Sequence, residues 1–285
     1  MHKFVISGFA DEIADDLDAQ LNVLESLDIF YIEMRGVNGK PLVHHTTDEA
    51  RAIKKKLDAR GFKISAIGSP LGKIKITDPF PPHLDLFKHT LEIARILETE
   101  YIRIFSFYMP QGEDPSGYRD AVMERWSSFI REAQGSNLIL AHENEKDIYG
   151  DTPERCLDLL QTMNCPYFKA VFDPANFIQC DVETYPKAYE MLKGHLAYLH
   201  IKDALYRDHS VTPAGHGDGK IERILEDLRR RNFEGFLSLE PHLGSFTGLS
   251  AIDPHSEINR LPAGGPQKFA IAADALRKLL KKIAN

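Results

Sequence analysis

Short β-rich apolar runs alternate with longer amphipathic segments eight times along this chain of 285 residues. A strand that is followed each time by a helix predicts a parallel sheet with helical crossovers, because parallel neighbours need a long return connection. The predicted strands are residues 3–9, 30–35, 62–68, 101–107, 137–143, 167–173, 196–202 and 235–241. The predicted helices cover about 15–27, 47–60, 83–98, 117–134, 153–163, 184–193, 220–231 and 266–283.

Eight such units are the number that closes a sheet into a barrel. The same order of elements also suits an open doubly wound sheet, but the first strand-to-helix turn, residues 7–12, lacks the glycine-rich sequence of a dinucleotide fold. No low-complexity stretch or charged block divides the chain. We therefore expect one α/β domain over residues 1–285, a single (β/α)8 TIM barrel. The long segment Leu243–Pro266 after the last strand is expected to cover part of the active face as a lid.

The composition narrows the classes of partner. The net charge is −7 and the isoelectric point is about 6.0, so the chain has no general attraction for nucleic acid or for anionic membranes. The three cysteines are odd in number and none has zinc-knuckle spacing, which indicates free thiols. No run approaches the ~20 apolar residues of a membrane helix, and the first residues do not resemble a signal peptide. We expect a cytoplasmic protein that binds a small neutral or polar molecule.

Acidic residues and a histidine end four consecutive predicted strands. Glu143 ends the fifth, Asp173 the sixth and Glu240 the eighth, and His200 lies near the end of the seventh. In this fold the C-terminal strand ends meet at one mouth, where active sites gather. An ionised carboxylate after an apolar run is costly unless it is paired or bound to a metal. Any one of these residues alone is equally well explained as a helix cap or a lysine partner, but the four together predict one divalent-metal site.

The residues around these positions carry a family resemblance. The motifs are Ala141-His-Glu143-Asn-Glu145, Phe172-Asp173-Pro-Ala-Asn176, His200-Ile-Lys202-Asp203, Pro213-Ala-Gly215-His-Gly217-Asp-Gly219 and Leu239-Glu240-Pro-His242. With them the chain resembles the xylose isomerase-like TIM-barrel superfamily of sugar isomerases and epimerases, which includes ketose 3-epimerases and inosose dehydratases. The resemblance spans all eight units, and its specific part is residues 139–240.

The resemblance implies that Glu143, Asp173, His200 and Glu240 bind one metal ion, and that Glu143 and Glu240 are also the catalytic acid/base pair. Three carboxylates and an imidazole form an oxygen-rich donor set that suits Mn²⁺ or Mg²⁺, with Zn²⁺ or Co²⁺ also open. Two vicinal oxygens of a sugar or polyol would complete the coordination, so that the ion stabilises an enediolate while the carboxylates move protons. The resemblance also implies a homodimer.

Two positions depart from the ketose 3-epimerases. Those enzymes have a histidine three residues after the strand-6 aspartate, where this chain has Asn176. They also have an arginine soon after the strand-7 histidine, for which Arg207 is a loose match. Both changes leave the ligand set intact. They keep a second reaction open beside isomerisation or epimerisation: a metal-dependent lyase or dehydratase that acts on an inosose or a 3-keto-glycoside through similar enolate chemistry.

Two residues that follow His200 are candidates for supporting roles. Lys202 lies two positions later and therefore points to the same side of the strand. There it contacts a substrate oxygen or forms an ion pair with Glu240 or Glu143. Asp203 either orients His200 through its free ring nitrogen, as a carboxylate behind a metal ligand does, or caps a helix.

Three more side chains are predicted to bind the substrate, namely Asn176, His242 and Phe107. His242 either reaches the mouth or is a rim histidine without a role, and Phe107 either forms an apolar wall against a sugar ring or packs in the core. Deeper in the barrel, Glu33 and Arg103 interrupt the second and fourth strands. Because even-numbered strands share interior layers, we expect these two to form a structural ion pair.

Two other functional classes share the fold. Endonuclease IV-type nucleases need three zinc ions and additional histidines, whereas strands 2 to 4 here end in Arg35, Gly68 and Phe107. The negative net charge also disfavours a nucleic-acid partner. A sugar-binding barrel without catalysis would not need both Glu143 and Glu240 beside a metal. The leading prediction is therefore a metal-dependent sugar isomerase or epimerase.

Overall fold

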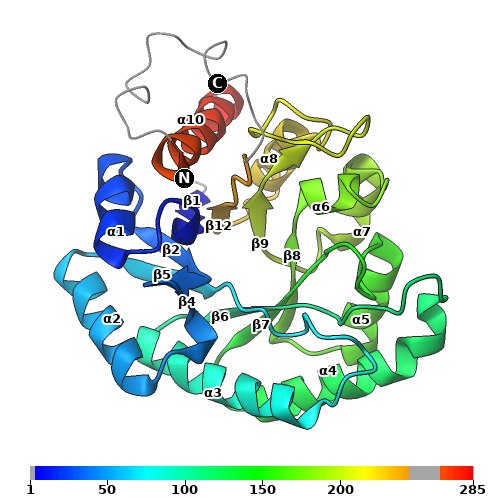
Figure 1. Ribbon diagram of the computed structural model, residues 1–285. Helices are drawn as coiled ribbons and strands as arrows, with labels where there is room; N and C mark the ends of the chain where they lie inside the picture. Colours follow the sequence, from blue (N-terminus) through cyan, green and yellow to red (C-terminus); the bar gives the residue numbers. More distant parts are fainter. Residues whose placement is uncertain (1–3, 244–263, 285) are drawn as a thin grey trace.

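The structure is a computed structural model that describes residues 4–243 and 264–284. Its centre is an eight-stranded parallel sheet with the order β1-β12-β9-β8-β7-β6-β5-β2. The strands form a nearly closed barrel with helices around it (Figure 1), which confirms the predicted (β/α)8 architecture. They are β1 (Phe4–Gly8), β2 (Tyr31–Met34), β5 (Lys63–Ile67), β6 (Tyr101–Ile104), β7 (Ile139–Glu143), β8 (Phe168–Phe172), β9 (Leu196–Ile201) and β12 (Gly235–Leu239).

Helices follow the strands and lie outside the barrel. Polar caps explain two of the starts: α2 begins after a capping box of Thr46 and Glu49, and α5 begins after Thr152, whose hydroxyl accepts the backbone N–H of Arg155. The helices are α1 (Leu17–Ser26), α2 (Thr47–Ala59), α3 (Pro81–Leu97), α4 (Arg119–Ala133), α5 (Pro153–Met163), α6 (Pro174–Ile178), α7 (Tyr189–Leu192), α8 (Ile221–Arg230) and α10 (Gly265–Ala284). Two small hairpins, β3 (Gly36–Val37) with β4 (Lys40–Pro41) and β10 (Asp203–Ala204) with β11 (Val211–Thr212), lie in the loops.

Some elements differ from the sequence prediction. The fourth predicted strand, 101–107, ends at Ile104 because the backbone N–H groups of Phe105 and Phe107 donate to the loop after β5. The predicted helix 184–193 is interrupted near its start, where Tyr185 has an extended backbone, and it continues to α7. Nearly all of the predicted lid, Leu243–Pro266, lies outside the described residues.

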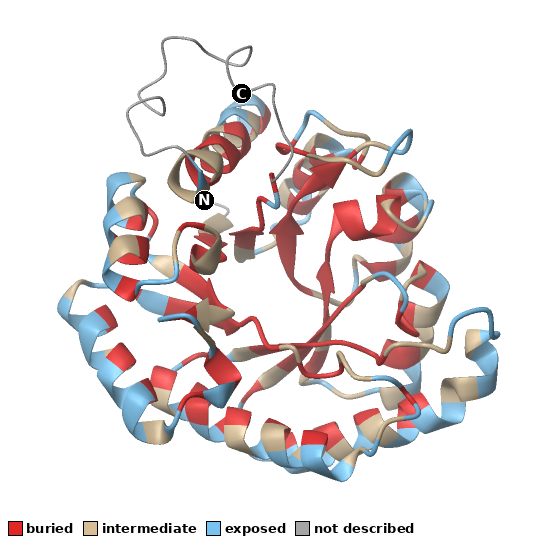
Figure 2. Ribbon diagram, viewed as in Figure 1, coloured by how far each residue is buried: buried red, intermediate tan, exposed pale blue. Residues whose placement is uncertain are grey.

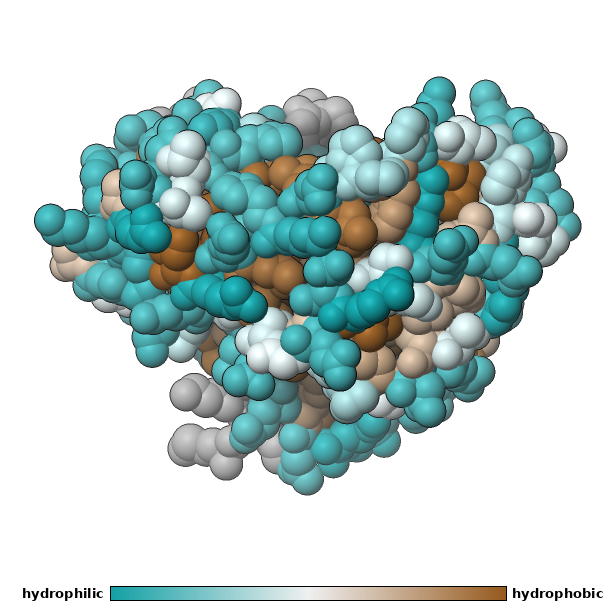
Figure 3. Space-filling view, turned by 90° about the horizontal axis from the view of Figure 1, so that it is seen from below, coloured by the Kyte–Doolittle hydropathy of each residue, from teal (hydrophilic) through white to brown (hydrophobic). Residues whose placement is uncertain are grey.

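The core lies between the sheet and the helices. Figure 2 shows buried strands and helices whose outward faces are exposed. In α1, for example, Leu17, Leu21 and Leu24 recur at helical spacing and are fully buried. The face of the molecule in Figure 3 is mainly hydrophilic, with small apolar areas between polar side chains. Among the described residues, no helix combines the length and the apolar character that crossing a membrane requires.

The register of the sheet aligns the ends of four neighbouring strands. β12, β9, β8 and β7 are consecutive in the sheet, with Leu239 opposite Ile201 and Phe172 opposite Leu199. Glu143 is opposite Val171, one residue before the end of β8. The residues at or just after these strand ends therefore share one level at the C-terminal mouth of the barrel.

Candidate metal centre

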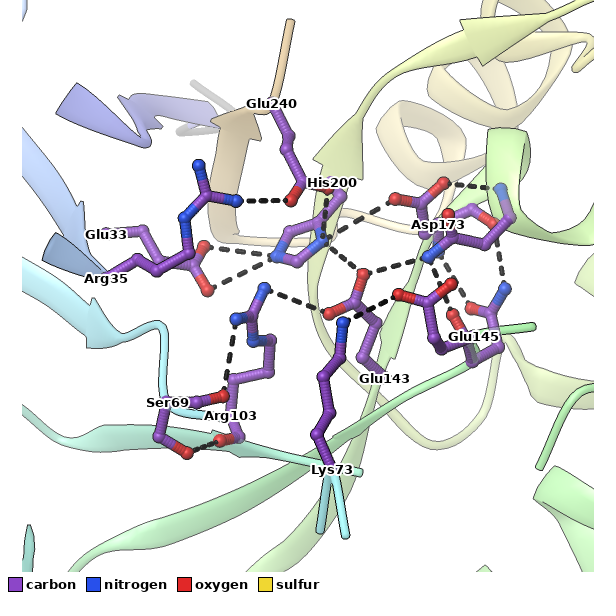
Figure 4. A network of polar contacts seen from close by, with 12 residues as sticks. Glu33, Arg35, Ser69, Lys73, Arg103, Glu143, Glu145, Asp173, His200 and Glu240 are labelled. Atoms are coloured by element: carbon purple, nitrogen blue, oxygen red, sulfur yellow. Dashed lines mark hydrogen bonds and ion pairs between the residues drawn. The ribbon is translucent and has the colours of Figure 1, made fainter. Parts of the chain in front are cut away.

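Four side chains from these neighbouring strands converge at the mouth (Figure 4). Glu143 ends β7, His200 lies in β9, and Asp173 and Glu240 directly follow β8 and β12. One nitrogen or oxygen of each side chain lies within 4.8 Å of those of the other three, and all four residues are buried. The structure thus brings together the predicted ligand set, and three carboxylates with one imidazole suit a divalent ion.

Asp173 is held in place by the helix that it caps and by Asn144, which directly follows the neighbouring strand β7. Its Oδ1 caps α6 by accepting the backbone N–H of Asn176 at 2.9 Å, and Pro174 fills the first helical position. The side-chain amide of Asn144 bonds both the N–H and the carbonyl oxygen of Asp173, each at 2.9 Å. The second carboxylate oxygen, Oδ2, is left to face His200 at 3.7 Å.

The two ring nitrogens of His200 have different partners. Nδ1 faces the cluster, 2.9 Å from Glu143 Oε1 and 3.6 Å from Glu240 Oε2. Nε2 lies 3.2 Å from both carboxylate oxygens of Glu33, which also accepts the hydroxyl of Tyr198 at 2.8 Å. A carboxylate behind the ring fixes the proton on Nε2 and leaves Nδ1 as the donor atom for a metal.

Asp203 does not orient His200, so that prediction is wrong. Its carboxylate accepts the backbone N–H groups of Gly215, Gly217 and Gly219 at 2.9–3.1 Å and that of Ala204 at 2.9 Å. The glycine-rich loop after β9 is therefore folded around a buried anion. A Cβ on Gly217 would lie 2.3 Å from Asp203 Oδ1, so the loop can approach the carboxylate this closely only with glycine at that position.

Three cations pair with the ligand carboxylates. Lys202 Nζ lies 2.7 Å from Glu240 Oε2 and 2.9 Å from Asp173 Oδ2. Arg35 contacts the other oxygen of Glu240 at 3.2 Å. Arg103 contacts Glu143 Oε2 at 3.1 Å (Figure 4).

The expected Arg103–Glu33 ion pair is not formed, because each of the two residues contacts the metal-ligand set instead. Arg103 pairs with Glu143 and donates a further bond to the carbonyl oxygen of Ser69 at 3.3 Å. Glu33 is engaged with His200 and Tyr198. The sequence placed both charges in the interior and gave a structural ion pair as the first interpretation, before a functional one.

The pairing controls the charge of the buried groups. Burial alone would raise the pKa of Glu240, but the positive charges of Lys202 and His200 outweigh it and hold that pKa well below its ordinary value. Burial also acts against the ammonium of Lys202, yet the carboxylates of Asp173 and Glu240 raise its pKa. Glu240 is therefore a carboxylate and Lys202 a cation at neutral pH.

The donor atoms fit a bound cation. Among the described residues, no hydrogen bond reaches the buried oxygen Asp173 Oδ2, which faces His200 Nδ1, although Lys202 lies at ion-pair distance. Buried carboxylate oxygens without hydrogen bonds are costly unless a cation neutralises them. A divalent ion held by Glu143, Asp173, His200 and Glu240 would satisfy this oxygen.

Comparison with known proteins identifies the family of this chain. The family model described as xylose isomerase-like TIM barrel matches residues 21–279. The chain belongs to this family. No curated protein matched the sequence.

Several solved structures have the same xylose isomerase-like barrel. A D-tagatose 3-epimerase-like protein has a TM-score of 0.77 at 13% identity, over 99% of this chain and 98% of its own. The IOLI protein with a zinc atom has a TM-score of 0.75 at 15% identity, over 98% and 99%. The probable 3-DHS dehydratase AsbF from Bacillus anthracis has a TM-score of 0.74 at 14% identity, over 96% and 98%. At these identities the likeness shows the fold, and the structural neighbours include both epimerase-like and dehydratase members.

The predicted substrate-binding residues occupy different surroundings in this xylose isomerase-like barrel. Asn176 is buried behind the cluster, where its amide donates to Glu143 Oε1 at 3.1 Å and to the Asn144 carbonyl oxygen at 2.9 Å. Phe107 is fully buried on the helix side of the barrel against Phe80 and Phe129. The prediction that Phe107 forms a wall of the mouth is therefore wrong, because the chain leaves the sheet before this residue.

The rim of the mouth combines the predicted His242 with Glu12 and Phe269, which the sequence did not single out. His242 Nε2 lies 3.2 Å from Glu12 and 3.6 Å from Glu240. Burial and the neighbouring Glu240 raise the pKa of Glu12 to about 7. Glu12 and His242 border a cavity of about 440 Å³ that is also lined by Pro241, Leu243 and Phe269, and most of its lining is apolar. Because Glu240 precedes Pro241 in the chain, this cavity lies beside the metal-ligand set.

An aromatic ring does reach the cluster, and it comes from the end of β1. Phe9 makes an edge contact with His200 at 5.1 Å between ring centroids. The guanidinium groups of Arg35 and Arg103 lie 4.8 and 5.1 Å from its ring.

One signal in the sequence could have assigned Arg103 and Glu33 to the site. A charged residue inside an apolar barrel strand needs a partner of opposite charge or a hydrogen bond, and the metal-ligand residues provide both.

Proposed function

We propose that this chain is a divalent-metal-dependent isomerase or epimerase of a sugar or sugar derivative. The observation that carries the proposal is the convergence of Glu143, Asp173, His200 and Glu240 at the mouth, with donor atoms within 4.8 Å. The oxygen-rich set favours Mn²⁺ or Mg²⁺, and Zn²⁺ or Co²⁺ would also fit. When bound, the ion would stabilise negative charge on two vicinal oxygens of the substrate.

The proton transfers are assigned to Glu143 and Glu240. Their strands are separated in the sheet by β8 and β9, so the two carboxylates come to the cluster from different sides. Each is held on one oxygen by an arginine, Arg103 for Glu143 and Arg35 for Glu240. The other oxygen of each glutamate faces the cluster. There it can remove a proton from a substrate carbon next to a carbonyl group, or donate a proton back to that carbon. Asn176 fixes the orientation of Glu143.

A lyase or dehydratase is the second candidate. Asn176 stands where the ketose 3-epimerases have a histidine, and its amide donates a hydrogen bond to Glu143. Unlike a histidine, this amide is neutral and neither gains nor loses a proton. The fold is also that of a protein described as a probable dehydratase. An inosose or a 3-keto-glycoside would lose water or its aglycone after the same proton abstraction. Product mass distinguishes the two, because isomerisation and epimerisation leave the mass unchanged.

A DNA-repair nuclease is disfavoured. Apart from the four-residue cluster, the described residues offer one other group of metal-ligand type, Glu12 with Glu240 and His242. Arg35 already contacts the Glu240 oxygen that faces this group, 3.2 Å away. A guanidinium at that position opposes the binding of a second dication.

The test is solvent exchange in D₂O with Mn²⁺-loaded protein. Free ketoses, inososes and 3-keto-glucosides are incubated with it and followed by NMR and mass spectrometry. A substrate should gain deuterium at one carbon, and Glu143→Gln and Glu240→Gln should each lower the rate by about 10²–10⁴-fold. The matched control is Glu154→Gln, a surface glutamate paired with Lys187, which should retain full activity. Turnover without incorporation of deuterium would assign a hydride shift and remove the proton role from both glutamates.

A further inference from the structure

Lys202 occupies an unusual position for a lysine. It is 4% exposed, and its ammonium lies between two carboxylates of the ligand set, 2.7 Å from Glu240 Oε2 and 2.9 Å from Asp173 Oδ2. These are the same two oxygens that face His200 Nδ1, at 3.6 and 3.7 Å. Lys202 therefore contacts the same two oxygen atoms that would bind a metal ion.

The buried charges show why a cation is needed there. Four buried carboxylates, those of Glu33, Glu143, Asp173 and Glu240, surround His200, and the buried lysine and arginine beside them are Lys202 and Arg103. Arg35 adds a contact with Glu240 from the rim of the mouth. With a neutral imidazole as metal ligand, a dication balances the four negative charges together with the two buried positive ones. Arg103 is engaged with Glu143 and the Ser69 carbonyl oxygen. Lys202 lies between Asp173 and Glu240, and it is closer to their facing oxygens than His200 Nδ1 is.

The fit of the ammonium is incomplete. Its contact with Glu240 is a hydrogen bond, but the contact with Asp173 Oδ2 is at ion-pair distance without hydrogen-bond geometry. A tetrahedral ammonium has three directed hydrogens, whereas a divalent ion draws its ligands from all sides. Asp173 Oδ2, which Lys202 satisfies poorly, is therefore the oxygen for which a metal ion competes best.

We infer that Lys202 is a built-in competitor of the metal ion. It holds Asp173 and Glu240 together in the metal-free protein, gives up at least one of these contacts when an ion enters, and weakens the affinity for the ion. The inference rests on the proposed metal-dependent function. Its physical basis is that an ammonium within 3 Å of two ligand oxygens occupies their lone pairs and repels a dication in a buried site.

Calorimetric titration of Mn²⁺ into chelator-stripped protein tests the inference. Lys202→Met should bind Mn²⁺ about ten-fold more tightly than the unchanged protein, or more, because the repulsion and the competition are both removed. The matched control is Lys73→Met. Lys73 is at the rim, paired with Glu145 at 3.0 Å and over the ring of Phe105. Its removal deletes the same charge without touching a ligand oxygen, so the affinity should stay within about two-fold.

The outcomes separate this inference from the proposed function. The inference is supported if Lys202→Met binds Mn²⁺ more tightly than the unchanged protein and Lys73→Met does not. The same holds if Lys202→Met binds Mn²⁺ and the unchanged protein binds it too weakly to measure. Equal or weaker binding by a folded Lys202→Met overturns the inference and leaves the metal-dependent function standing. Binding by none of the proteins overturns both.

A second measurement applies if Lys202→Met fails to fold. The crystal structure of the Mn²⁺-loaded unchanged protein should show Lys202 Nζ beyond hydrogen-bond distance, about 3.5 Å, from Asp173 Oδ2 or Glu240 Oε2. An ammonium that still contacts both oxygens beside a bound ion would overturn the inference.

Discussion

Both carboxylate oxygens of Glu33 lie 3.2 Å from Nε2 of His200, although 167 residues separate the two in the sequence. Glu33 is in β2 and His200 in β9, and β1 and β12 stand between these strands around the barrel wall. The contact therefore crosses the interior. It assigns the ring proton to Nε2 and presents Nδ1 to the three carboxylates at the mouth.

The first prediction concerns this contact. Glu33→Gln should lower the affinity for Mn²⁺ by about 10–100-fold, because a neutral amide holds the imidazole less firmly and reduces its basicity. Tyr198→Phe removes the other hydrogen bond to Glu33 but keeps its charge, so its effect should be smaller. Calorimetric titration of both variants measures the difference. Unchanged affinity in Glu33→Gln would show that the carboxylate does not support the ligand.

The second prediction concerns stoichiometry. Elemental analysis after loading should find about one divalent ion per chain, and His200→Ala should lose it because one of the four donors is gone. At a free metal concentration 100 times the dissociation constant, the ion should stabilise the fold by about 2.7 kcal/mol. His216→Ala, in an exposed part of the glycine-rich loop, is the control and should load normally. Full loading of His200→Ala would mean that the ligand set is wrong.

The third prediction concerns the loop around Asp203. Gly217→Ala should lower the free energy of unfolding by about 2 kcal/mol or more, because the added methyl group collides with a buried carboxylate and separates it from its N–H donors. Gly194→Ala, where the new Cβ meets nothing within 4 Å, should be nearly neutral. Denaturant unfolding of the two variants makes the comparison. Equal stability would indicate that the loop moves away from Asp203 without cost.

The fourth prediction concerns acid stability, through His83 in α3. Its Nε2 accepts the backbone N–H of Gly72 at 2.7 Å, and burial lowers the pKa of His83 from 6.5 to about 4. The unfolded chain binds this proton at higher pH than the folded protein does. The contribution is therefore fully present above pH 6.5 and is lost as the pH falls from 6.5 towards 4.

His83→Gln keeps a possible acceptor for Gly72 but has no proton to gain. Its melting temperature should therefore fall less between pH 7 and pH 5 than that of the unchanged protein. Thermal unfolding monitored by circular dichroism at the two pH values provides the measurement. The same loss of stability in both proteins would exclude His83 as a cause of acid lability.

The four-residue cluster could be predicted from the sequence because the fold determines its geometry. Once strands and helices alternate eight times, all C-terminal strand ends must meet at one mouth, and Glu143, Asp173, His200 and Glu240 stand at those ends. No knowledge of side-chain packing is needed for that step. The extent of each strand is harder to predict, and the error at Phe107 arose there.

The errors at Phe107 and Asp203 have definite physical causes. After Ile104 the chain bonds to the loop that follows β5, with the N–H of Phe107 donating to Gly72, so the alternation of the strand no longer predicts where Phe107 points. Asp203 follows Lys202 directly, and consecutive residues of an extended chain face opposite sides. Lys202 faces the cluster, and Asp203 accordingly faces the glycine-rich loop.

The order of strands in the sheet also has a consequence for synthesis of the protein. The backbone ladder of β1 is formed with β12, and among the described strands none pairs with β1 on its other side, where β2 lies. β1 thus depends for its partner on a strand that is synthesised more than 200 residues later. The middle strands can pair as they emerge from the ribosome, but β1 must wait, with its apolar side chains unprotected, until β12 has been made. We expect nascent chains that stop before β12 to need a chaperone.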